Sequence, residues 1–239
     1  MAAVHENQST NIPAEGMQCD PQNVLTGNEK RIQSCKKVGG KHKKDGHDKE
    51  GTFNEKYNPE WKGTISTKAE ADCEISHDHE ILKILKEKGI IDNMEQRHTS
   101  NKSGGSIQLT LGNIPELSKD DNLEWIKENS MTLLNKYFKK VGSSKPSDLL
   151  VYDTGNSRLF FNMDRVIKFM EDNCEFRKLK SGRIKGDFKD ECSRTGKRAL
   201  LTYEYNKKKK SYFLGFSGGQ GKHFIKLLKT KINCHEDPY

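Results

Sequence analysis

The aromatic residues of this chain are distributed very unevenly, and this limits where a core can form. The chain has 2 Trp, 7 Tyr and 10 Phe in 239 residues, but only Phe53, Tyr57 and Trp61 precede residue 119. Aromatic side chains dominate core burial, so the core is expected in the second half. The hydrophobic content is 32% and the mean hydropathy −0.93. So little apolar surface favours one small domain over two.

Residues 1–77 are predicted to be a disordered polar arm, because they are rich in Asn, Gln, Gly, Lys and Asp and lack periodic apolar spacing. Within this arm, a lysine cluster predicts a nuclear localisation signal, although a solvated charge cluster is the simpler alternative. Six cysteines without close pairing fit a reducing compartment, so the nucleus is expected and the cytoplasm is the alternative. No apolar run is long enough for a membrane span, and no membrane partner is expected. The lysine cluster that predicts the nuclear localisation signal comprises Lys36, Lys37, Lys41, Lys43 and Lys44.

The segment 78–92 carries the first helical pattern, over residues 78–88, with Asp78 as a possible cap and Gly89 as terminator. About three turns is marginal for an isolated helix, so it either docks on the domain or folds on a protein partner. Its position between polar stretches favours the partner. Residues 93–116 are predicted to be a linker with a short strand over 107–111. The apolar stripe expected to bind the partner is Ile81, Leu82, Ile84 and Leu85.

Residues 117–233 are predicted to form a basic α+β domain, followed by a frayed tail over 234–239. The order is not a repeated strand–helix–strand alternation, so we expect a mainly antiparallel sheet with helices packed on one face. The apolar spacing predicts helices over 122–140, 163–173 and 223–232, with a strand as the alternative for the last. The expected strands are 149–153, 158–161, 175–179, 183–188, 199–205 and 211–216.

Charge density is the strongest functional signal. The chain has a net charge of +8, and residues 177–231 hold 17 Lys and Arg against four Asp and Glu. Such a segment attracts polyanions, and aromatics on a basic sheet can stack bases, so the domain is expected to bind RNA or DNA. Alternatively, the aromatics face the core and the lysines only provide solubility. The predicted phosphate contacts are Arg183, Lys185, Lys197, Lys207, Lys208, Lys209, Lys210, Lys222 and His223, and the predicted stacking residues are Tyr212 and Phe213.

A glycine-rich loop, Ser217 to His223, lies between the last predicted strand and helix. Exposed backbone N–H groups at such a loop can hold an anion, although a flexible turn is the simpler interpretation. The spacing of its glycines does not match a nucleotide-triphosphate loop, which requires four residues between the glycines. A phosphate-handling enzyme that uses Gly218–His223 is therefore only a weaker alternative.

Other chemistry has little support in the sequence. Cys73, His77 and His79 lack the two separated ligand pairs of a zinc finger, so no metal or cofactor is expected. No nucleophile–base arrangement is visible, and a non-enzymatic protein is expected. The main alternative to nucleic-acid binding is an adaptor whose basic face binds an acidic protein surface.

Overall fold

The computed structural model describes residues 41–60, 71–112, 123–206 and 211–239, and its strands form two five-stranded sheets. All pairings between the described strands are antiparallel except β2 with β4, which is parallel. The first sheet has the order β1 (Cys73–Glu74), β2 (His98–Ser103), β4 (Leu149–Asp153), β5 (Ser157–Asn162), β10 (Cys234–Pro238). The second has the order β3 (Ile107–Gly112), β9 (Ser211–Phe216), β8 (Lys197–Asn206), β7 (Ile184–Lys189), β6 (Cys174–Lys178).

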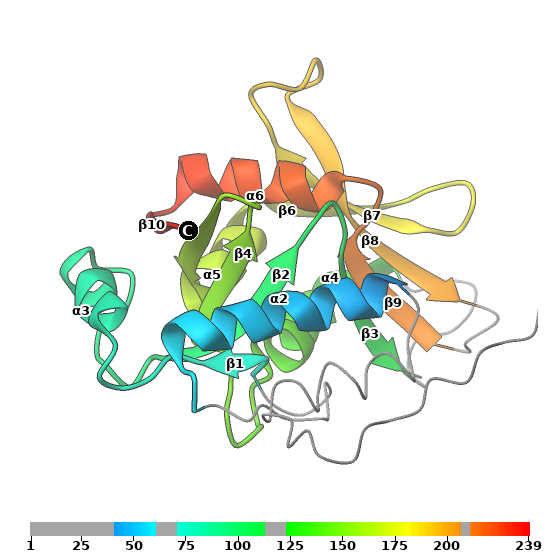
Figure 1. Ribbon diagram of the computed structural model, residues 1–239. Helices are drawn as coiled ribbons and strands as arrows, with labels where there is room; N and C mark the ends of the chain where they lie inside the picture. The colour runs from blue at the N-terminus through cyan, green and yellow to red at the C-terminus, as the bar shows by residue number, and fades with distance from the viewer. Residues whose placement is uncertain (1–40, 61–70, 113–122, 207–210) are drawn as a thin grey trace, which may run out of the picture.

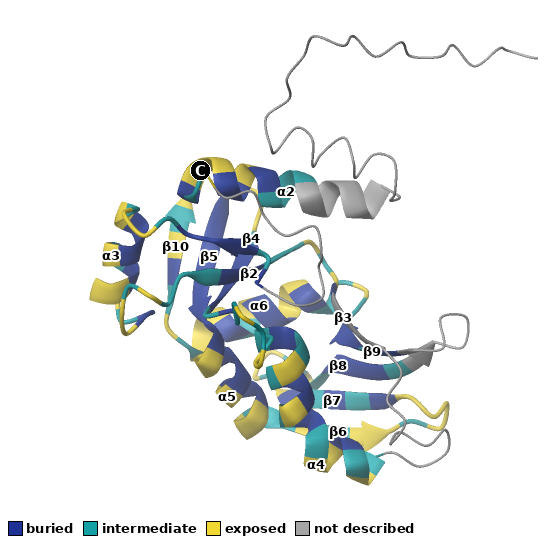
Figure 2. Ribbon diagram, turned by 90° about the horizontal axis from the view of Figure 1, so that it is seen from below, coloured by how far each residue is buried: buried dark blue, intermediate teal, exposed yellow. Residues whose placement is uncertain are grey.

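Helices cover both faces of the first sheet and one face of the second (Figures 1 and 2). Helix α5 lies between the sheets and contacts β4, β5 and β7, while α4 and α6 pack on strands of the second sheet. The α+β class with mainly antiparallel pairing is confirmed, with two sheets in place of one. The helices are α2 (Lys41–Tyr57), α3 (Glu80–Glu87), α4 (Leu123–Leu134), its π-helical continuation η1 (Asn135–Lys139), α5 (Met163–Asn173) and α6 (Gln220–Lys231).

Alternation along β4 and β5 gives the first sheet two apolar faces. Leu150 and Phe161 point into the large core shared with α4, α5, α6 and the second sheet. Val151 and Phe160 point the other way, into a second cluster closed by α2 and α3. Successive side chains of a strand point to opposite faces, so these strands need cover on both sides.

Part of the predicted arm belongs to the folded domain, because α2 and β1 lie within residues 1–77. Phe53 and Tyr57 are four residues apart on one face of α2, and both are at most 1% exposed. Their rings lie 4.6 Å apart, and the Tyr57 ring meets Phe160 edge-on at 5.6 Å. These two aromatics seal the outer face of the first sheet, which explains the order of this segment. Residues 1–40 and 61–70 lie outside the described residues, so the prediction of disorder is not tested there.

The helix predicted over 78–88 is α3, and it docks on the domain instead of presenting its stripe to a partner. Ile81, Leu82 and Leu85 are buried in the cluster that contains Phe160, and Ile84 packs against it. The N-cap is His79, whose Nδ1 accepts a hydrogen bond from the Ile81 N–H at 3.1 Å. The partner-binding assignment of this stripe is therefore corrected: the first sheet supplies the apolar surface that the helix needs.

The C-terminal residues form a strand, not a frayed tail. Strand β10 pairs with β5 along its whole length, from Cys234 opposite Phe161 to Pro238 opposite Ser157. Beyond it, the Tyr239 N–H donates to the Asn156 carbonyl at 3.2 Å. Without β10, one edge of β5 would be left with unpaired backbone groups, which accounts for the ordering of this polar segment.

A half-buried carboxylate, that of Asp72 directly before β1, joins this segment to its neighbours. Asp72 accepts hydrogen bonds from Lys102 Nζ at 2.9 Å, Lys140 Nζ at 3.0 Å and the Asn101 N–H at 2.9 Å. Burial alone would raise the pKa of Asp72, but the two ammonium groups outweigh it and hold this pKa well below its usual value. The ionised carboxylate therefore stabilises the fold at neutral pH.

The Asp72 ion cluster predicts a loss of stability in acid. A depressed folded-state pKa contributes stability above the unfolded value of about 3.9, and this contribution disappears as the pH falls through the folded value. The urea-unfolding free energy of Asp72→Asn should therefore lie below that of the wild type at pH 7, by a gap that shrinks below about pH 4. A gap of the same size at pH 7 and pH 3 would contradict this account.

The packing of α2 predicts that the N-terminal half is needed for stability. Replacing Phe53 with Ala should lower the free energy of unfolding by about 3–5 kcal/mol, because a large cavity opens under α2. The control is Lys83→Ala on the exposed face of α3, which should change it by less than about 0.5 kcal/mol. Chemical denaturation of the full chain checks both values. Equal stability of the two variants would show that α2 is dispensable.

Candidate nucleic-acid interface

The predicted stacking residue Tyr212 points into the core of the second sheet. It is 4% exposed and shares the inner face of β9 with Leu214 and Phe216. A ring in that position cannot stack on a base, so this assignment is corrected. Phe213 lies on the outer face, half-buried, opposite Glu204 of β8. It is the one of the two predicted stacking residues that faces outward.

Cations on the outer face of the second sheet are largely paired with carboxylates of other strands in the same sheet. Arg183 Nη2 lies 3.1 Å from Glu204 Oε1, and Lys197 pairs with Glu175. Arg177 donates to both carboxylate oxygens of Asp187. The sheet face therefore carries cross-strand ion pairs, and its predicted phosphate contacts Arg183 and Lys197 already have anionic partners.

Lys185 also has a protein partner. It is half-buried on β7 and donates to the Thr202 hydroxyl of β8. Its burial, followed by the positive charge of Arg183, lowers its pKa. A partly desolvated lysine in this position supports the strand pairing and is a weak candidate for phosphate contact.

Among the described residues, unbalanced positive charge lies on a surface that we call the basic ridge: residues 189–198, which connect β7 to β8, together with α6. The ridge holds eight Lys and Arg against Asp190 and Glu191. Its two segments are joined at both ends, because Arg198 Nη2 lies 3.2 Å from His223 Nε2 and Lys231 Nζ lies 2.8 Å from Glu191 Oε1. The connection between β7 and β8 is seen beside α6 in Figure 1.

Four exposed cations of the ridge form no ion pair with any described residue: Lys189, Arg194, Lys222 and Lys226. Lys222 and the neighbouring His223, both predicted as anion contacts, are exposed on the first turn of α6. Sequence reasoning missed Lys189, Arg194 and Lys226. The spacing of Lys222, Lys226 and Lys229 opposite the apolar stripe of α6 would have identified the helical part.

The glycine loop before α6 is explained by packing. Gly219 is the N-cap residue with φ of 85°, and the Gln220 N–H donates to the Ser217 carbonyl at 3.0 Å. The Gly221 N–H donates to the Gly105 carbonyl at 2.9 Å, and a Cβ atom on Gly221 would lie 2.9 Å from that oxygen. Two of the N–H groups that an anion nest would use are therefore engaged within the protein.

One predicted set of phosphate contacts lies outside what the structure describes. Lys207, Lys208, Lys209 and Lys210 lie outside the described residues. Among the described residues, no group of three or more His, Cys, Asp or Glu side chains is placed to hold a metal ion. Within the same ranges, none of the helices combines the length and apolar character needed to cross a bilayer.

The close contact at Gly221 predicts a steric effect of substitution. Gly221→Ala should lower the free energy of unfolding by about 1–3 kcal/mol, because the new methyl group meets a backbone oxygen that cannot easily move. The matched control is Gly51→Ala in α2, where a Cβ atom would meet nothing within 4 Å. There, Ala should raise stability by up to about 1 kcal/mol through its helix propensity. Thermal and urea unfolding would refute the packing account if both variants behaved alike.

Comparisons of this chain with protein families, curated proteins and solved structures gave no match.

Proposed function

We propose that this protein binds the phosphate backbone of nucleic acid, RNA or DNA, through the basic ridge. The observation that supports the proposal is the set of four exposed ridge cations without an ion pair among the described residues. Lys189 and Arg194 lie on one segment of the ridge and Lys222 and Lys226 on the other, on segments joined at Arg198–His223 and Lys231–Glu191. Adjacent unpaired cations raise the local positive potential and release counterions when phosphates bind.

Contact through the ridge would be with phosphates and not with bases. The described exposed side chains of residues 189–198 and of α6 include no Phe, Tyr or Trp ring, and Phe224 of α6 is fully buried. Phosphate contacts position a nucleic acid without reading its sequence. We therefore expect binding that is strongly salt-dependent and nearly independent of base sequence.

Localisation and an alternative function are separate from this binding proposal. Nuclear localisation stays a prediction from the lysine cluster that ends at Lys44. An adaptor function, with the ridge bound to an acidic protein surface, uses the same cations. The two ligands differ in how their negative charges are spaced. A nucleic-acid strand carries phosphates at regular intervals and engages all four cations, and counterion release then gives a linear dependence of log K on log salt.

The proposal predicts a defined loss in the variant Lys222→Ala/Lys226→Ala. Its affinity for a single-stranded oligonucleotide should fall at least tenfold at low salt, and the slope of log K against log salt should decrease in magnitude by about 1.4, since two phosphate contacts are lost. Fluorescence anisotropy at several salt concentrations measures both quantities.

The matched control for this pair is Lys83→Ala/Lys86→Ala, two exposed lysines on α3. It should retain the affinity and slope of the wild type. No binding of the wild-type chain to RNA or DNA at low salt would exclude the proposal and leave the adaptor function. Equal losses in both double variants would show that only net charge matters and that the ridge is not the site.

A further inference from the structure

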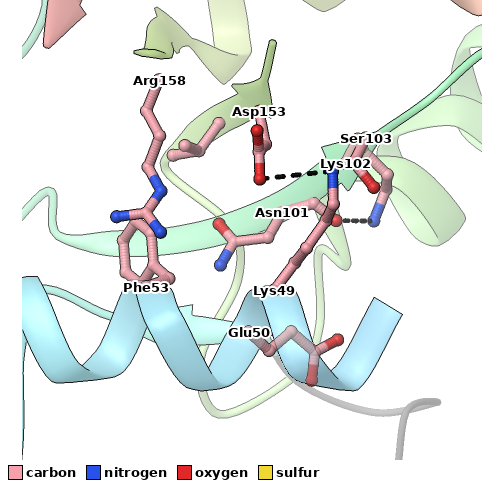
Figure 3. Close-up of a pocket in the computed structure, with 9 residues that line it drawn as sticks. Lys49, Glu50, Phe53, Asn101, Lys102, Ser103, Asp153 and Arg158 are labelled. Atoms are coloured by element: carbon pink, nitrogen blue, oxygen red, sulfur yellow. Dashed lines mark hydrogen bonds and ion pairs between the residues drawn. The ribbon is translucent and has the colours of Figure 1, made fainter. Parts of the chain in front are cut away.

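A small cavity lies on the opposite side of the first sheet from α5, and none of the residues that line it belongs to the basic ridge. It is enclosed by α2 and by the ends of β2, β4 and β5, and its volume is about 60 Å³. It sits at the carboxyl ends of β2 and β4, the parallel pair, where open sheets commonly bind ligands. Figure 3 shows Phe53 and Lys49 of α2 on one side of it and Asp153 and Arg158 on the other.

Arg158 brings a buried positive charge to this cavity without an anionic partner. The residue is 2% exposed, and its guanidinium lies over the rings of Phe53, Tyr57 and Tyr239 at 4.8 to 5.3 Å. Nη2 donates to the Thr52 hydroxyl at 3.0 Å, whereas Nη1 is buried and has no hydrogen-bond partner. Ring contacts stabilise a cation only partly, and a buried charge is costly unless it is paired.

The two carboxylates nearest to Arg158 in the sheet are bound to other cations. Asp153 on β4 and Asp237 on β10 lie directly across from Arg158 on the neighbouring strands. Asp153 pairs with Lys49 at 3.4 Å, and Asp237 pairs with Lys56 at 2.9 Å. The charges of Asp153 and Asp237 are therefore balanced by those of Lys49 and Lys56, and the positive charge of Arg158 is left without a carboxylate partner.

Asn101 supplies the second polar group of the cavity wall. Both atoms of its side-chain amide are buried and lack a hydrogen-bond partner. In Figure 3 the Asn101 amide and the Arg158 guanidinium point toward each other across the space beside Phe53. Buried polar groups in proteins nearly always have hydrogen-bond partners. The Asn101 amide atoms and Arg158 Nη1 are buried, belong to residues that line one cavity and lack partners, and this indicates a ligand.

We propose that this cavity binds a small carboxylate, with its oxygens accepting from Arg158 Nη1 and the Asn101 amide. A single negative charge balances the one unpaired guanidinium. A doubly charged phosphate would place its second charge near Asp153 and Glu50, which also line the cavity. By the measure in which one water needs about 10–15 Å³, the cavity accommodates a group of about four non-hydrogen atoms, the size of acetate. The site is independent of the ridge.

The test is a titration of the full chain with sodium acetate at constant ionic strength, followed by NMR of the Asn101 side-chain NH₂ and the Arg158 Nε–H. The expected result is a saturable shift of both signals, absent with sodium chloride. Acetamide, which has the same shape without the charge, and inorganic phosphate should each bind at least tenfold more weakly. A linear shift equal to that with chloride, or equal binding of acetate and acetamide, would overturn the proposal.

Three variants localise the effect. Asn101→Leu keeps the shape of the side chain and should weaken acetate binding at least tenfold. Lys49→Met changes a rim residue that is 41% exposed, so it tests the cavity even if the Asn101 variant fails to fold. In Lys49→Met, Asp153 loses its lysine partner and its negative charge repels acetate, so acetate binding should fall at least threefold. The control Lys83→Met removes an exposed lysine of α3 that does not line the cavity, and it should bind acetate as the wild type does. Equal losses in both lysine variants would refute the site.

Discussion

The burial of the first sheet on both faces is the constraint on which the rest of this structure depends. β4 and β5 alternate apolar side chains in both directions, so water must be excluded from each face. Helix α5 and its neighbours cover one face. The other face is covered by segments from the polar first half of the chain, chiefly Phe53 and Tyr57 of α2 and the apolar stripe of α3. Only 32% of the residues are hydrophobic, and the second face is covered by Phe53 and Tyr57, which lie far in the sequence from β4 and β5.

The same constraint determines where charge can accumulate. Helices α4, α5 and α6 pack on the inner face of the second sheet. Its outer face is left to the solvent and is therefore polar. Cross-strand pairs such as Arg183–Glu204 and Lys197–Glu175 neutralise that face. The surplus of lysine and arginine remains on the outer side of α6 and on the neighbouring residues 189–198. The close approach of Gly221 to Gly105 fixes the start of α6 and hence the position of Lys222.

Local patterns predicted much of the second half of the chain, because turn residues and caps act over a few positions. The hairpin of β4 and β5, the strand 211–216 and the helix capped by Asn162 follow from such signals. Helix α2 did not, since its only apolar anchors, Phe53 and Tyr57, are isolated among charged residues and glycines. Strand β10 was also missed, because its Glu, Asp and Pro have low strand propensity and pairing with β5 overrides it.

The site was harder to predict than the fold. Ion pairs between strands depend on register, which a single strand does not reveal, so Arg183 and Lys197 could not be recognised as partners of Glu204 and Glu175. The inward position of Tyr212, in contrast, follows from alternation with Leu214 and Phe216. A buried arginine next to the apolar run of β5 gives no local signal, and the cavity at Arg158 emerges only from the packing of α2.

Lysine footprinting would test the central claim most directly. The full chain is acetylated briefly with and without a saturating oligonucleotide, and modification at each lysine is measured by mass spectrometry. The account predicts that nucleic acid protects Lys189, Lys222 and Lys226, while Lys83 and Lys86 react equally in both samples. Protection of the lysines of α3 to the same degree, or protection confined to residues 1–44, would contradict a nucleic-acid site on the basic ridge.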